Sequence, residues 1–111
     1  MAREQFQNLT EPMFYILLAL RDEVCGVDIM ERVTMLSRGR VRIGPGTLYA
    51  MLQKFEKNNI IRQTRFAGRQ KWYIITDAGR KMLEEEILRL QTLLRDAEAV
   101  WVPDLAAEFP D

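Results

Sequence analysis

The chain has 111 residues, 48% of them hydrophobic and 29% charged, which is enough for one globular domain with a modest core. It holds no histidine and one cysteine, and its formal net charge is zero, so histidine-based metal sites, serine–histidine catalysis and an internal disulfide are not expected. No apolar run reaches the roughly 20 residues of a membrane span, and the first residues do not resemble a secretory signal, so we expect a cytoplasmic protein.

Three helices are expected in the first half of the chain. Thr10 and Pro12 are typical of a helix start, and apolar residues at helical spacing continue to Leu20. A second helix is predicted from Gly26 to about residue 37, and a third from Pro45 to residues 58–59. In the third helix the spacing predicts three inward-facing side chains, which are Leu48, Leu52 and Phe55.

Two β-strands are predicted next, at residues 60–66 and 70–75, joined by a tight turn at residues 67–69. Because neighbouring strand residues point to opposite faces, only one of Trp72 and Tyr73 is expected in the core. Thr76 and Asp77 are predicted to start a last helix that Pro103 stops, followed by an acidic tail at 104–111.

The last predicted helix carries a heptad-like apolar seam. Its members alternate at spacings of four and three residues, and they are Leu83, Ile87, Leu90, Leu94, Ala97 and Trp101. The seam could pack on its own domain, but it is longer than a small domain can cover, so we expect it to form a homodimer. The adjacent run at 84–86 is all glutamate and is expected to form a solvated face.

The zero net charge hides a strong segregation of charge along the chain. Residues 38–71 contain nine Lys or Arg side chains against one acidic residue, Glu56, a net charge of +8. The other 77 residues carry seven basic and 15 acidic side chains. Chance clustering on a solvated surface is the alternative, but such segregation favours a surface that binds a polyanion.

These elements predict a mainly α fold with a small β-hairpin, a winged helix-turn-helix followed by one long C-terminal helix. The expected organisation is a winged-helix DNA-binding domain at 1–76 with an N-terminal arm at 1–9, a dimerisation helix at 77–103, and the tail. In this architecture the third helix enters the major groove of double-stranded DNA and the hairpin lies against the backbone.

Several segments resemble the PadR family of transcriptional regulators, over roughly residues 9–90. They are Leu9-Thr10-Glu11-Pro12, Gly26-Val27-Asp28-Ile29, Ile43-Gly44-Pro45-Gly46-Thr47-Leu48-Tyr49, Lys71-Trp72-Tyr73 and Thr76-Asp77-Ala78-Gly79. The resemblance implies a homodimeric repressor that binds a palindromic operator and is released by a small aromatic effector. In some members an aromatic residue of the last helix holds planar ligands; that position falls at Leu90 here, not at Trp101, so Trp101 is assigned to packing.

The predicted DNA-binding residues are those of the third helix's outer face, the loop before it and the hairpin. They are Arg42, Pro45, Gly46, Thr47, Tyr49, Ala50, Gln53, Lys54, Arg65, Arg69 and Lys71. The alternatives are that residues 45–47 only cap the helix, that Tyr49 is buried, and that the hairpin is merely solvated. The competing function is a protein-interaction module without specific DNA binding. No nucleophile or phosphate-loop motif suggests an enzyme, and no cofactor is expected.

Overall fold

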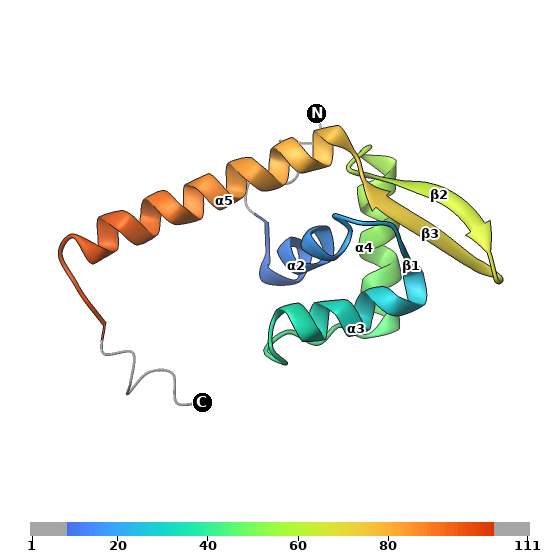
Figure 1. The fold of residues 1–111 in the computed structure, drawn as a ribbon, viewed down its shortest axis with the longest axis horizontal. Coiled ribbons are helices and arrows are strands. Elements are labelled where there is room, and N and C mark those ends of the chain that lie inside the picture. The colour runs from blue at the N-terminus through green and yellow to red at the C-terminus, as the bar shows by residue number, and fades with distance from the viewer. Residues whose placement is uncertain (1–8, 104–111) are drawn as a thin grey trace.

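The computed structural model of the chain describes residues 9–103, so the predicted acidic tail and nearly all of the predicted N-terminal arm lie outside the described residues. Within this range the chain forms α2 (Glu11–Ala19), β1 (Val24–Cys25), α3 (Gly26–Leu36) and α4 (Pro45–Lys57). These are followed by β2 (Ile61–Ala67), β3 (Gln70–Ile75) and α5 (Asp77–Glu98). The predicted fold class is confirmed: helices α2 to α4 pack beside a β-hairpin wing, and α5 leaves the domain as a long arm (Figure 1).

The helix starts follow the capping residues that the sequence suggested. The Thr10 side chain accepts a hydrogen bond from the Met13 amide, 3.4 Å away, and Pro12 occupies the first turn of α2. Thr76 caps α5 by accepting from the Gly79 amide at 3.0 Å. At the end of α4, Asn59 takes a φ of 60°, the left-handed conformation that asparagine tolerates.

The sheet has one more strand than predicted. It has the order β1-β3-β2 and is antiparallel throughout, with Val24 opposite Tyr73 and Cys25 opposite Trp72. A strand of two residues is too short to show a period, so the prediction of a two-stranded sheet was wrong at this edge. The added strand ties the start of α3 to the wing.

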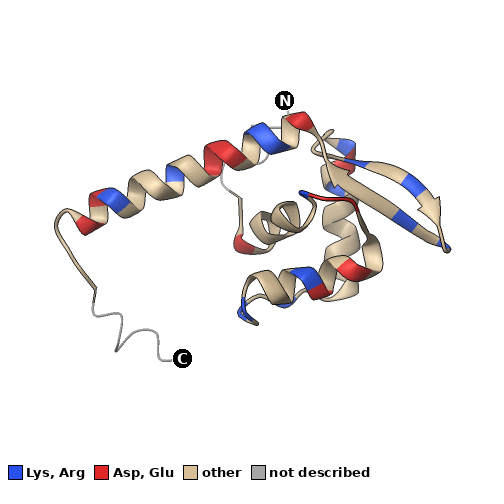
Figure 2. Ribbon diagram, in the orientation of Figure 1, with Lys and Arg blue, Asp and Glu red and all other residues tan. Residues whose placement is uncertain are grey.

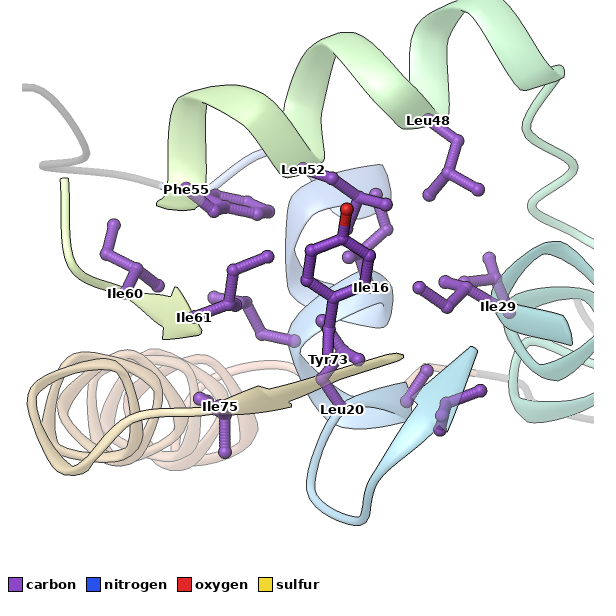
Figure 3. Packing of buried hydrophobic residues seen from close by; sticks show 14 of the residues in the cluster. Ile16, Leu20, Ile29, Leu48, Leu52, Phe55, Ile60, Ile61, Tyr73 and Ile75 are labelled. Atoms are coloured by element: carbon purple, nitrogen blue, oxygen red, sulfur yellow. The ribbon is translucent and has the colours of Figure 1, made fainter. Parts of the chain in front are cut away.

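One hydrophobic core joins all these elements (Figure 3). Its fully buried members come from α2, α3, α4, the start of β2 and the residues next to α2 and β2, and the largest are Phe55, Ile16, Leu17, Leu20, Ile29, Leu48, Leu52, Ile60 and Ile61. Tyr73 of β3 points toward α4 and completes the core from the sheet side (Figure 3). Its neighbour Trp72 is half-buried and, by the alternation of a strand, lies on the opposite face. The core therefore fixes α4 and the wing relative to each other.

Helix α5 is attached firmly by its first turns. A Cβ atom on Gly79 would overlap the carbonyl oxygen of Ile60 and approach Ile75 to 2.8 Å, so only glycine allows α5 to start this close to the sheet. Met82 and Leu83 are buried against the core. The helix ends at Glu98, five residues before the proline at which the sequence analysis placed its end.

Glu86 does not lie on a solvated face as expected; it is 7% exposed. It lies one turn after Met82 and Leu83, so it faces the domain rather than the solvent. Its carboxylate accepts two hydrogen bonds from Arg89, at 2.9 and 2.7 Å, and this contact raises the pKa of the Arg89 guanidinium. The charge of Glu86 is thereby balanced where α5 leaves the domain.

Candidate nucleic-acid interface

The outer face of α4 is presented to solvent because its inner face supplies the core. Leu48, Leu52 and Phe55 are at most 1% exposed, as the helical spacing predicts. The residues predicted to contact DNA from this helix are all exposed: Pro45, Gly46, Thr47, Tyr49, Ala50, Gln53 and Lys54. Tyr49 is 43% exposed, so the alternative that places it in the core is not what the structure shows.

The N-terminus of α4 is suited to an anion. Its N-cap residue is Gly44, which offers no side-chain hydrogen bond, and no acidic residue lies in the first turn. The amides of this turn therefore lack a capping side chain at the positive end of the helix dipole. A DNA phosphate is one anion that such an end can accept.

The loop that leads into α4 is held by Ser37, a residue that the sequence analysis did not single out. Ser37 is fully buried, and its hydroxyl accepts a hydrogen bond from the Val41 amide at 2.9 Å. The hydroxyl oxygen also lies 3.2 Å from the Val41 carbonyl and 3.3 Å from that of Thr34. A serine just after a helix gives no signal distinct from capping, so only the contacts show that it closes the loop from 38 to 41.

The basic residues of this loop have different surroundings. Arg40 donates a hydrogen bond to the Tyr15 hydroxyl at 2.8 Å, which ties it to α2. Arg38 has a φ of 55° and is exposed, and the predicted DNA contact Arg42 is exposed just before α4. A guanidinium nitrogen of Arg42 lies 3.8 Å from the position that a Cβ on Gly39 would take, so its side chain borders this loop.

The wing projects from the domain beside α4 and carries Lys and Arg along both strands and at its turn (Figure 2). The turn residues Gly68 and Arg69 both have a φ of 61°, the conformation of the tight hairpin turn that matches strand twist. Arg69 is therefore displayed at the wing tip despite the modest cost of positive φ for a residue with a side chain.

The structure separates the three basic residues predicted to act together in the wing. Lys71 lies on the same face as Tyr73, toward α4, whereas Arg65 is opposite Trp72 and lies on the other face. Arg65 pairs with Glu23 at 3.4 Å, and its guanidinium lies 4.1 Å from the centre of the Trp72 ring. A shift in register between Gln63 and Arg65 sets this alternation, and a bulge of this kind cannot be located from sequence.

A groove of about 470 Å³ lies between α4 and the wing. Its walls include Tyr49 and Gln53 from the helix and Arg69 and Lys71 from the wing. The phenol of Tyr73 also lines it; burial raises the pKa of Tyr73, and the nearby Glu56 carboxylate and Tyr49 add to the rise. The groove thus has basic side chains at the wing, and along the helix it has the uncharged polar groups of Tyr49 and Gln53 together with the acidic Glu56.

The predicted dimer seam divides into parts with different surroundings. Leu83 is buried and Ile87 packs against the core of the same chain, whereas Leu90 and Leu94 are 41% and 58% exposed. Ala97 is also exposed, and Trp101 lies beyond the helix end and is 75% exposed. The members of the seam left exposed for a second copy are thus Leu90, Leu94, Ala97 and Trp101, and Leu88 and Leu93 are also exposed on α5.

Among residues 9–103 there is no candidate metal site and no candidate membrane span. This range holds no group of three or more His, Cys, Asp or Glu side chains placed to bind a metal ion. None of its helices is long and apolar enough to cross a membrane.

Comparison with known proteins identifies a family. Residues 16–85 match the transcriptional regulator PadR-like family. A curated relative, an uncharacterized 37.1 kDa protein in transposon TN4556 of Streptomyces fradiae, is 36% identical over 63 residues. That match covers 57% of this chain but only 18% of the relative's own length.

Solved structures show the same fold at low sequence identity. A PadR-like transcriptional regulator from Bacillus cereus aligns with a TM-score of 0.65 at 22% identity, covering 87% of this chain and 95% of that one. A transcriptional regulator from Clostridium thermocellum also gives a TM-score of 0.65, at 18% identity, covering 80% and 87% of the two chains.

Proposed function

Because the chain belongs to the PadR-like family of transcriptional regulators, we propose that it is a regulator that binds a specific palindromic operator in duplex DNA as a homodimer. The observation that carries the proposal is the exposed surface formed by the outer face of α4 and the wing, which meet at one groove, with the exposed loop residue Arg42 just before α4. This surface lies in the segment whose net charge is +8. A positive surface of this kind binds DNA phosphates by releasing condensed counterions.

Each part of this surface has a distinct role in the proposal. Helix α4 enters the major groove, where Tyr49 and Gln53 reach base edges. The first-turn amides of α4 and the side chains of Arg42 and Lys54 contact phosphates, which fixes the helix in register. Arg69 and Lys71 of the wing contact the neighbouring backbone and add affinity that does not depend on sequence.

Helix α5 supplies the surface through which a second copy of the chain pairs in this proposal. Its distal half has Leu90, Leu93 and Leu94 exposed, and apolar side chains at this spacing are typical of helix pairing. The proposal requires that pairing through α5 hold two copies of α4 about 34 Å apart, which is the spacing needed to read one face of a palindrome. These leucines also suit a protein-interaction module, but such a module has no need of the basic surface.

A repressor released by a small planar effector is the finer form of the proposal. It is supported by family membership alone, because Leu90 stands where some members carry the ligand-binding aromatic residue. Trp101 lies beyond the helix and is exposed, so packing against a second copy remains its proposed role.

The wing tip offers a sharp test. Asparagine accepts a positive φ, so Arg69→Asn removes the charge while keeping the turn and the free energy of unfolding. On a duplex taken from DNA beside the gene, we expect affinity to fall severalfold and the slope of log K against log salt to become shallower by about 1. Arg95→Gln, in the last turn of α5, is the matched control and should bind as the wild type does. Equal affinity for all three proteins would refute this role of the wing.

A further inference from the structure

Tyr49 rests on a residue that has no side chain. A Cβ atom on Gly26 would lie 3.1 Å from both Cε1 and the hydroxyl oxygen of Tyr49, and 3.5 Å from Cζ. Ordinary van der Waals contacts are longer than the first two of these distances. The aromatic ring of α4 therefore occupies space that a side chain at the first residue of α3 would take.

The same ring borders the proposed DNA-binding surface. Tyr49 is 43% exposed, and both it and Gly26 line the groove between α4 and the wing. Gly26 itself is buried beneath the ring. A side chain added at position 26 would therefore displace the Tyr49 ring, which is part of the proposed DNA-binding surface.

We propose that Gly26 is a positioning residue that sets the orientation of Tyr49 and thereby the base preference of the protein, without contacting DNA. The inference rests on the proposed function. Hydrogen bonds to base edges weaken steeply outside a narrow range of distance and angle, so a displacement of a few tenths of an ångström alters which base is preferred. An alanine at position 26 requires a displacement of that size from the ring.

The fold does not need glycine here for its backbone. Gly26 is not among the glycines with positive φ, which are Gly39 and Gly68, and it lies in a helix, where alanine is the better helix former. The helix propensity of alanine therefore opposes the cost of displacing the half-exposed Tyr49 ring, and Gly26→Ala should change the unfolding midpoint little. An effect on base preference can then be separated from a loss of folded protein.

The test is a double-mutant cycle of Gly26→Ala and Tyr49→Ala. The probe is a duplex from DNA beside the gene, chosen by footprinting with the wild-type protein, together with a panel of its single-base variants. When Tyr49 is present, we expect Gly26→Ala to change the ratio of affinities for two duplexes that differ at one base pair, by about fivefold or more at one position of the duplex. In the Tyr49→Ala background the same substitution should change no ratio more than twofold. Val27→Ala, at an exposed neighbouring position of α3, is the matched control and should leave all ratios unchanged.

Two results would overturn the inference while leaving the proposed function intact. The first is that Gly26→Ala leaves all the affinity ratios unchanged. The second is that Gly26→Ala changes these ratios equally in the wild-type and the Tyr49→Ala backgrounds. A wild-type protein that binds none of the duplexes would overturn both proposals. NMR tests the contact without DNA: Tyr49→Ala should remove a ring-current shift from the Gly26 α-protons, and an unchanged shift would show that the ring does not rest there.

Discussion

Substituting Ser37 with alanine tests whether the loop before α4 is held as described. The change removes the hydroxyl that accepts from the Val41 amide at 2.9 Å, inside a site where Ser37 is 0% and Val41 8% exposed. A buried amide that loses its partner costs about 1–3 kcal/mol, because water cannot replace the lost acceptor. We expect the free energy of unfolding to fall by that amount, as measured by urea denaturation.

Thr34→Val is the matched control for this substitution. The Thr34 hydroxyl lies on the same helix and donates to the Met30 carbonyl, one turn back, at 3.1 Å. Its loss leaves no buried amide without a partner, so a change below about 0.5 kcal/mol is expected. DNA affinity should fall in Ser37→Ala even under conditions where the protein stays folded, because the loop positions α4. A loss of stability in Ser37→Ala no larger than in Thr34→Val would refute the reasoning.

Three further predictions concern the wing, the dimer and the core. Lys71→Gln should weaken DNA binding severalfold at low salt. Arg65→Gln should have a smaller effect, because Arg65 is already paired with Glu23. If DNA titrations show a larger loss of affinity for Arg65→Gln than for Lys71→Gln, the separation of the two faces is contradicted. Replacing Leu90 and Leu94 together with serine should weaken dimerisation by about 100-fold or more, measured by sedimentation, with helix content retained; unchanged self-association would exclude this seam. Because folding raises the pKa of Tyr73, its phenol ionises at a lower pH in the unfolded chain than in the folded protein. The free energy of unfolding of the wild type should therefore fall as pH rises from about 10 through the folded pKa. Tyr73→Phe should lack this loss when the free energy of unfolding is measured over the same pH range.

The sequence predicted those features that arise from local patterns. The spacing of Leu48, Leu52 and Phe55 and the Pro45 start defined α4 correctly, because one amphipathic stripe determines which side of a helix is buried. The wing turn followed from a glycine between two β-rich runs. Family resemblance gave the same architecture independently, and the family match confirms it.

The features that escaped prediction depend on tertiary contacts. Strand β1 exists because residues 24–25 meet β3, not because two residues have a strand pattern. Glu86 is buried because Arg89 and the position of α5 allow it, although its neighbours along the chain are glutamates. The separation of Arg65 from Lys71 depends on the register shift in β2, and the contact of Gly26 with Tyr49 joins residues from two helices.

The most direct test of the central proposal is the salt dependence of binding to a duplex from DNA beside the gene. We expect log K to fall linearly with log salt between about 50 and 200 mM, with a steeper loss for a duplex that carries both half-sites than for one half-site alone. A footprint on the same DNA should show two protected regions centred about one helical turn apart. No detectable binding to any duplex at the lowest salt, from a folded protein, would contradict the account.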